Sequence, residues 1–242
     1  MCGIFGIIGQ GSNDDVRLEL AARSLRHRGP DSHEIVQLPG VSLGHTLLSI
    51  IGSSPITQPI RSSDGRGILT YNGEIYNYLE LLRNNPDLLA ACQGRPATDT
   101  VVLVEGLRLY GEEFLEQLNG MFAFCYHDLN SGQTLLVRDR LGIKPLFYSA
   151  TGTGMIFASE TQAVRVLSGK AFAPSPEGFY SYVRFRYPLG DRSFDLNIRQ
   201  LRPGHLLRIG ANGKVQTVRW WVNDGSGEFT GTYEQAVDTV RE

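Results

Sequence analysis

Cys2 has the side chain best suited to covalent chemistry in this chain, because its thiol is a nucleophile and only Met1 precedes it. Removal of Met1 leaves the thiol and a free α-amino group on one residue. An α-amino group has an ordinary pKa of about 7.7–8.0, so it can act as a base near neutral pH. This pairing predicts an N-terminal nucleophile that carries its own base. A cysteine at position 2 can also be an inert thiol, so other residues must distinguish a catalytic nucleophile from an inert side chain.

Asn72, Gly73 and Glu74 follow an apolar run that is typical of a strand. A thiolate that attacks an amide carbonyl creates an oxyanion, which needs preorganised hydrogen-bond donors. The side-chain amide of Asn72 and the backbone N–H of Gly73 can supply such a pair. The alternative is a hairpin turn, which is the commoner use of Asn-Gly.

Asp99 begins the strongest helical pattern in the chain, over residues 99–110. A carboxylate at this position is favoured by the helix dipole, and it can serve only as an N-terminal cap. It can also bind an ammonium group of a substrate, with Glu74 as a second carboxylate. Glu74 alone is equally well explained as a solvated side chain.

Composition excludes several classes of protein. The 242 residues carry a formal net charge of −2 and no basic run, which argues against a nucleic-acid partner. Three cysteines, at positions 2, 92 and 125, do not form a disulfide framework and favour the cytoplasm. Met-Cys-Gly-Ile-Phe-Gly at the start lacks the basic residues and the apolar core of a signal peptide, so we expect none, and no apolar run in the sequence reaches membrane-spanning length. The five histidines are scattered without metal-ligand spacing, so no metal site is expected.

The order of elements indicates an α+β protein with antiparallel sheets and helices packed outside them. We expect helices at residues 14–25, capped by Ser12 or Asn13, and at 76–82, 99–110, 160–167 and 176–184. We expect strands at residues 4–8, 41–45, 67–71, 121–127, 134–138, 146–149, 155–158, 206–209 and 215–220. Asn212-Gly213 should turn the last hairpin.

The end of the sequence divides into a polar, glycine-rich linker and a short amphipathic helix. Thr232 and Gln235 have the spacing of a capping box at the start of this helix. A short helix with an unpartnered apolar face is marginal by itself. We therefore expect residues 1–222 to form one domain and residues 223–242 to lead to a second domain or a partner. The alternative is a frayed surface helix.

Several motifs, taken in order, resemble the glutaminase domain of the class II glutamine amidotransferases. They are Met-Cys-Gly-Ile-Phe-Gly at 1–6, Arg-His-Arg-Gly-Pro-Asp at 26–31, Tyr-Asn-Gly-Glu-Ile-Tyr-Asn at 71–77, Thr-Asp-Thr at 98–100, Asn-Gly-Met-Phe-Ala-Phe at 119–124, Arg-Asp-Arg-Leu-Gly-Ile-Lys-Pro-Leu at 138–146 and Ala-Ser-Glu at 158–160. Lys-Pro-Leu at 144–146 and Leu-Arg-Pro-Gly-His at 201–205 resemble the asparagine synthetase branch.

The resemblance implies a four-layer αββα sandwich of two antiparallel sheets, the N-terminal-nucleophile hydrolase fold. It also implies that glutamine is the substrate and that ammonia passes to an ATP-dependent domain. Cys2 would be the nucleophile and base, Asn72 and Gly73 the oxyanion hole, and Glu74 and Asp99 the binders of the glutamine head group. Arg28 would lie near the nucleophile.

Leu47 departs from the family pattern, in which an arginine at this position holds the α-carboxylate of glutamine. Leucine cannot make that charge-assisted contact. Its neighbours Ile50 and Ile51 belong to the same expected substrate-binding stretch. We expect weak glutamine binding, or a replacement cation such as Arg28, Arg61 or Arg66.

A Ser-Gly-Gly-x-Asp-Ser loop, which marks the family's ATP pyrophosphatase domain, does not occur in the sequence. ATP and Mg²⁺ are therefore expected only in a C-terminal synthetase domain or separate synthetase subunit, not in these 242 residues. The sequence leaves a homodimer open.

Two other functions remain open at this stage. Leu47 favours a docking or regulatory module whose ligand site has decayed, whereas the intact Cys2 and Asp99 favour an enzyme. The third hypothesis is an N-terminal-nucleophile amidase for a different amide. Such acylases commonly expose the nucleophile by cutting off a propeptide, whereas here only Met1 stands before Cys2.

Overall fold

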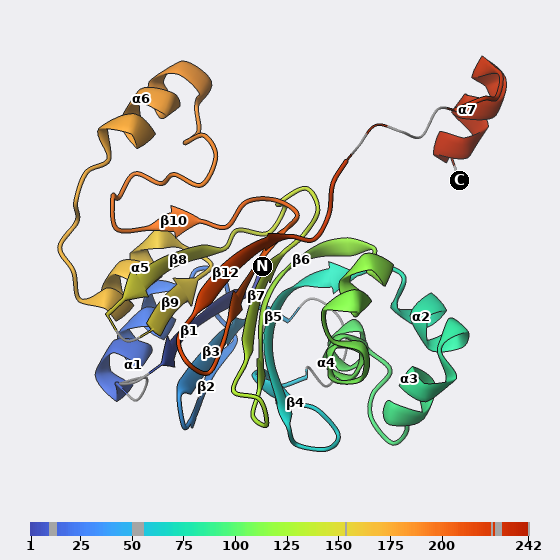
Figure 1. Ribbon diagram of the computed structural model, residues 1–242, viewed down its shortest axis with the longest axis horizontal. Coiled ribbons are helices and arrows are strands. Elements are labelled where there is room, and N and C mark those ends of the chain that lie inside the picture. Colours follow the sequence, from blue (N-terminus) through green and yellow to red (C-terminus); the bar gives the residue numbers. More distant parts are fainter. Residues whose placement is uncertain (10–13, 50–55, 153, 224, 226–228, 242) are drawn as a thin grey trace.

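Two antiparallel sheets, each of six strands, face one another in a computed structural model that describes residues 1–242 except 10–13, 50–55, 153, 224, 226–228 and 242 (Figure 1). In spatial order, the first sheet contains β10 (Arg199–Gln200), β8 (Phe147–Thr151), β9 (Gly154–Ala158), β1 (Gly3–Gly9), β3 (Val41–Leu47) and β2 (Ser32–Leu38). The second contains β12 (Val215–Arg219), β11 (His205–Ile209), β7 (Thr134–Arg138), β6 (Gly120–Asp128), β5 (Gly67–Ile75) and β4 (Ile60–Arg61).

Helices cover the outer face of each sheet, so the molecule has four layers. The first sheet is covered by α1 (Asp15–Ser24) and α5 (Thr161–Ser168). The second is covered by α2 (Tyr78–Asn84), α3 (Pro86–Ala91), α4 (Asp99–Tyr110) and the 3₁₀ helix Gly111–Gln117. The prediction of an α+β, four-layer sandwich of two antiparallel sheets is confirmed.

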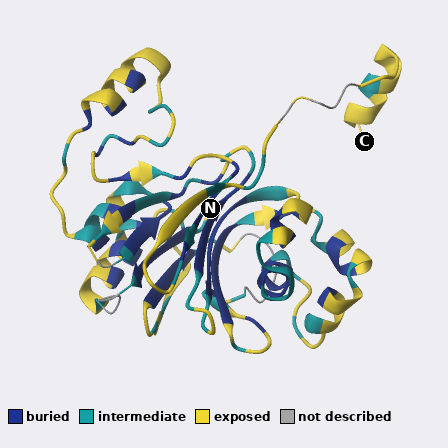
Figure 2. Cartoon of the chain, in the orientation of Figure 1, coloured by how far each residue is buried: buried dark blue, intermediate teal, exposed yellow. Residues whose placement is uncertain are grey.

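Alternation along β1 shows how the sequence builds two cores from one strand. Successive side chains of a strand point to opposite faces. Ile4 and Ile8 pack between the two sheets, whereas Phe5 and Ile7 pack against the helices α1 and α5. Both faces of β1 are therefore buried, as the dark strands of Figure 2 show.

Strand β5 has the same alternation in the second sheet. Leu69 and Tyr71 pack on the α4 side, and Ile68 packs between the sheets. Thr70 also points between the sheets, where its hydroxyl donates to the carbonyl oxygen of Gly44 in β3 at 3.0 Å. This bond ties the two sheets together beside the point where β3 and β5 approach the candidate site.

Most expected elements are present with ends shifted by a few residues, but two expectations need correction, and β2, β4, α3 and β10 were not predicted. Strand β5 does not end at residue 71, because it pairs with β6 as far as Ile75. Strand β2 was not predicted, since its exposed serine, histidine and glutamate hide its alternation. Helix α1 is capped by Asp14, whose carboxylate accepts from the N–H of Arg17 at 3.0 Å, whereas Ser12 and Asn13 lie outside the described residues.

Two helices stand apart from the sandwich (Figure 1). Helix α6 (Pro176–Phe185) exposes aromatic side chains such as Tyr180. Helix α7 (Tyr233–Arg241) begins with the expected capping box, in which the Thr232 N–H donates to the Gln235 side chain at 2.8 Å and the Gln235 N–H donates to the Thr232 hydroxyl at 3.3 Å. Among the described residues, no helix has both the length and the apolar character needed to span a bilayer.

Candidate active site

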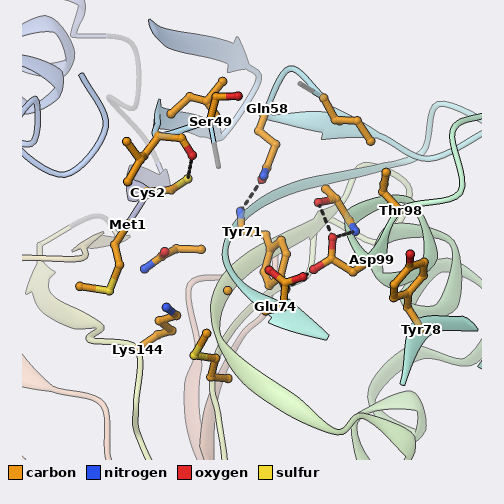
Figure 3. A pocket seen from close by; sticks show the side chains of 17 residues that line it. Met1, Cys2, Ser49, Gln58, Tyr71, Glu74, Tyr78, Thr98, Asp99 and Lys144 are labelled. Carbon is orange, nitrogen blue, oxygen red and sulfur yellow. Dashed lines mark hydrogen bonds between the residues drawn. The ribbon is translucent and has the colours of Figure 1, made fainter. Parts of the chain in front are cut away.

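Cys2 lies directly before β1, where the ends of β1 and β3 meet. Gly3 pairs with Thr46 in β3, and the Cys2 thiol lies 3.9 Å from the carbonyl oxygen of Leu48. Met1 and Cys2 both line a cavity of about 340 Å³ that extends toward β5 and the start of α4 (Figure 3). The nucleophile predicted from the sequence therefore faces a space large enough for a small molecule.

Asn72 is the first donor that the fold brings to this cavity. It is only 2% exposed, and its position two residues after Thr70 turns its side chain to the face between the sheets. Its amide nitrogen Nδ2 has no hydrogen-bond partner among the described residues. A buried donor without a protein partner costs roughly 1–3 kcal/mol, and because Asn72 lines the cavity, a ligand or a reacting group there could accept from it.

Gly73 supplies the second donor, and the strand pairing fixes the direction of its N–H. It lies opposite Phe122 in β6. The N–H of Phe122 donates to the Asp139 carboxylate at 3.2 Å, and its carbonyl accepts from the Asp139 N–H at 2.8 Å. Both groups of Phe122 therefore point away from β5. In an antiparallel pair the opposite residue does the same, so the N–H of Gly73 points away from β6.

On that side of β5 the neighbouring strand ends early. Strand β4 pairs only with Ile68 and Leu69, and the Gln58 side chain then accepts from the N–H of Tyr71 at 2.7 Å. Gly73 is the next residue with an N–H on this side, and it lines the cavity. The absence of a longer β4 in the described chain opens this part of the strand edge to a ligand.

Gly73 also has no room for a side chain. A Cβ atom added there would lie 2.3 Å from the carbonyl oxygen of Met121 and 2.7 Å from the Tyr71 ring. The close approach of β5 to β6 at this point therefore requires glycine, and the alternative interpretation of Asn72-Gly73 as a hairpin turn is wrong.

Asp99 and Glu74 place two carboxylates on the far wall of the cavity from Cys2 (Figure 3). The Asp99 carboxylate accepts from the Tyr71 hydroxyl at 2.7 Å and from the Ile75 N–H at 3.1 Å, so its position is fixed by β5. The cap of α4 is Thr98, whose hydroxyl accepts from the N–H of Val101 at 3.4 Å. Asp99 is thus the first helical residue.

Glu74 has a raised pKa because of partial burial and the nearby negative charge of Asp99, while Lys144 lowers it. Two neighbouring carboxylates, one of which raises the pKa of the other, form a site that favours a cation.

Arg28 lies beside the nucleophile, as expected. Its Nε donates to the backbone carbonyl of Cys2 at 3.1 Å, and its Nη1 lies 3.1 Å from the Glu160 carboxylate. Its side chain is 9% exposed, and Nη2 has no partner among the described residues. The contact with the Cys2 carbonyl fixes the backbone that carries the thiol.

The stretch expected to bind substrate after β3 is only partly described. Leu47 ends β3 and lines the cavity, where it presents no charge. Ile50 and Ile51 lie outside the described residues. Sequence analysis missed Lys144, which also lines the cavity and is only 6% exposed. Its sequence signals were its place in the family motif at 138–146, to which no site role was assigned, and its position as a lone lysine inside the apolar run 141–147.

The fold is that of the N-terminal-nucleophile hydrolases, with a thiol at the start of a central strand and two donors across a cavity. Two solved structures share this fold over 92% of the chain and 50% of their own. One is a glutamine phosphoribosylpyrophosphate amidotransferase from B. subtilis, with a TM-score of 0.62 and 22% identity. The other is described as the allosteric regulatory enzyme of purine biosynthesis, with a TM-score of 0.67 and 21% identity.

The chain belongs to the glutamine amidotransferase domain family, whose family model matches residues 1–221. It is 30% identical to asparagine synthetase [glutamine-hydrolyzing] 1 of Bacillus subtilis, over 89% of this chain and 34% of that protein. It is 36% identical to asparagine synthetase [glutamine-hydrolyzing] 3 of Arabidopsis thaliana, over 68% of this chain and 28% of that protein. The chain thus spans about a third of the length of these curated relatives.

Proposed function

We propose that this chain hydrolyses the side-chain amide of glutamine to glutamate and ammonia. The observation that carries the proposal is that two donors converge on the cavity that holds Cys2: the Asn72 amide, which has no partner among the described residues, and the Gly73 N–H. Two donors beside a nucleophile are what the tetrahedral oxyanion of acyl transfer requires.

The reaction begins when the α-amino group of Cys2, freed by removal of Met1, takes the thiol proton. The sulfur then forms a bond to the amide carbon, and the carbonyl electron pair moves to the oxygen, which Asn72 and Gly73 hold. As this pair returns, the carbon–nitrogen bond breaks, and the α-ammonium gives its proton to the leaving nitrogen as ammonia departs. Water then adds to the thioester, and the same steps release glutamate and the thiol.

The carboxylates of Asp99 and Glu74 bind the α-ammonium group of glutamine in this proposal. Their place across the cavity from Cys2 suits a substrate with a cation at one end and a reacting amide at the other. Arg28 acts as a positioning residue through the Cys2 carbonyl.

The ammonia passes to an ATP-dependent domain or separate subunit of the asparagine synthetase type, with asparagine as the product. The relatives' names and their greater length support this step. In this proposal, ATP and Mg²⁺ bind to that domain, and residues 223–242 connect it to the glutaminase domain. The protein is cytoplasmic in this proposal, which its small number of cysteines supports.

Incubation of the purified protein with glutamine, followed by assays of glutamate and ammonia, tests the proposal. We expect equal amounts of both products from the parent chain and none above background from Cys2→Ala. Cys92→Ala is the matched control, because Cys92 is a buried core thiol away from the cavity. No glutamate from the parent chain, or undiminished glutamate from Cys2→Ala, contradicts the proposal.

A further inference from the structure

Glutamine as a zwitterion needs a cation as well as an anion in its site. The cavity supplies carboxylates from Glu74 and Asp99, and Leu47 supplies no charge. Among the described residues that line the cavity, Lys144 is the one cationic side chain. The neighbouring residues 50–55 have the sequence Ile-Ile-Gly-Ser-Ser-Pro and so add neither lysine nor arginine.

The arginines considered from the sequence are engaged elsewhere. Arg28 donates to the Cys2 carbonyl and pairs with Glu160; its Nη2 has no partner among the described residues, but the residue does not line the cavity. Arg61 donates to the carbonyl oxygen of Gly65 at 3.3 Å and does not line the cavity. Arg66 is exposed, with its Nε 4.0 Å from Asp64, and does not line the cavity either.

Lys144 is held in place by a tightly bonded loop that follows β7. The Asp139 carboxylate accepts from the backbone N–H of Ile143 at 2.9 Å and of Lys144 at 3.0 Å. The Arg138 guanidinium donates to the carbonyl oxygens of Gly142 at 2.7 Å and of Lys144 at 2.8 Å. The backbone of Lys144 is thereby fixed, and its side chain extends into the cavity between Cys2 and Glu74 (Figure 3).

The surroundings of Lys144 favour an incoming anion. Its pKa is lowered, first by burial and then by the charge of Arg28, while Asp139, Cys2 and Glu74 oppose this shift. A bound carboxylate offsets the cost of keeping the ammonium charged. From the cavity lining, the neutral Leu47 and the engaged arginines, we propose that Lys144 binds the α-carboxylate of glutamine. The inference rests on the proposed glutaminase function and names the residue that replaces the family's arginine.

The test compares two substrates, glutamine and 4-aminobutanamide, which lacks only the α-carboxylate. For Lys144→Met we expect the KM for glutamine to rise about 10- to 100-fold, as for loss of one charge-assisted bond, while kcat changes less than about threefold. The kcat/KM for 4-aminobutanamide should stay within about threefold of the parent value. Lys170→Met is the matched control, because Lys170 is an exposed lysine away from the cavity.

Two further variants keep the test decisive. Leu47→Arg, added to Lys144→Met, should restore the preference for glutamine over 4-aminobutanamide. Lys144→Gln provides a second neutral side chain if the methionine variant is unstable. The ratio of kcat/KM for glutamine to kcat/KM for 4-aminobutanamide does not depend on the fraction of protein that is folded.

An unchanged KM for glutamine, or an equal loss on both substrates, overturns the role of Lys144. If the parent chain hydrolyses neither substrate, the proposed function itself fails, so the two failures are distinguishable.

Discussion

At the scale of single residues, the site depends on where two hydrogen-bond donors point. Asn72 holds its amide inside the sandwich without a partner among the described residues, and Gly73 turns its N–H to the open edge of β5. Both directions follow from strand alternation and not from a local turn. The same alternation buries the neighbouring Thr70 and Tyr71 on opposite faces, so the donors cannot shift independently.

Gly73→Ala tests the geometry of the proposed oxyanion hole. The added methyl group would lie 2.3 Å from the Met121 carbonyl oxygen, so β5 has to move away from β6. We expect glutaminase kcat to fall at least about 100-fold, the effect of losing one oxyanion donor. The control is Gly152→Ala, where a Cβ meets no atom within 4 Å. Near-parental turnover by a folded Gly73→Ala protein would show that this N–H takes no part.

His45 makes the stability of the fold depend on pH. Burial between the sheets lowers its pKa from 6.5 to about 4. Below pH 6.5 the unfolded chain binds a proton that the folded chain does not, so the free energy of unfolding falls as the pH drops from 6.5 toward 4. This shift corresponds to about 3 kcal/mol.

Urea unfolding of the parent and of His45→Gln at pH 7, 5.5 and 4.5 measures this effect. The loss of stability with falling pH should be smaller in His45→Gln, while the exposed-histidine control His33→Gln should follow the parent. Parallel curves for His45→Gln and the parent would refute the assignment.

At the scale of elements, the site forms where β5 extends beyond the end of its pairing with β4. Strand β5 pairs with β6 as far as Ile75, but β4 pairs only with Ile68 and Leu69. Helix α4 then brings Asp99 against the exposed part of β5, where the Tyr71 hydroxyl and the Ile75 N–H hold its carboxylate. The start of α4 and the end of β5 therefore position one another.

Thr98→Ala removes the side-chain cap at the start of α4, next to Asp99. The lost hydroxyl leaves the Val101 N–H without its partner, which costs about 1 kcal/mol of stability. We expect a matching loss in the free energy of unfolding by urea titration, together with a raised KM for glutamine because Asp99 is the adjacent residue. Thr98→Ser keeps the hydroxyl and should retain both values. Equal behaviour of the alanine and serine variants would contradict the role of this cap.

Sequence reasoning identified the layers and most strands because β1, β6 and β7 have apolar runs that only a buried sheet accommodates. It placed Asn72 and Gly73 after a strand because the apolar run of residues 67–71 ends before them, but long-range pairing with β6 extends the strand to Ile75. Lys144 was missed for the same reason. Its place in the cavity comes from bonds that Asp139 makes to its own loop and to Phe122, and no local pattern shows them.

At the scale of the whole molecule, the two sheets carry separate halves of the site. The first sheet supplies Cys2 and Arg28 packs beside it, while the second supplies Asn72, Gly73 and Glu74. The inter-sheet core and the bond from Thr70 to Gly44 hold these halves at a fixed separation. Cys2 and the two donors thus meet only in the assembled sandwich.

The most direct test of this account is covalent capture of the nucleophile. The folded protein, with Met1 removed, is treated with a diazoketone analogue of glutamine, and the modified residue is located by mass spectrometry of peptides. The account predicts one adduct, on Cys2, with excess glutamine slowing its formation and with Cys92 and Cys125 unmodified. An adduct formed elsewhere, or a Cys2 thiol that stays unmodified while glutamine is hydrolysed, would contradict it.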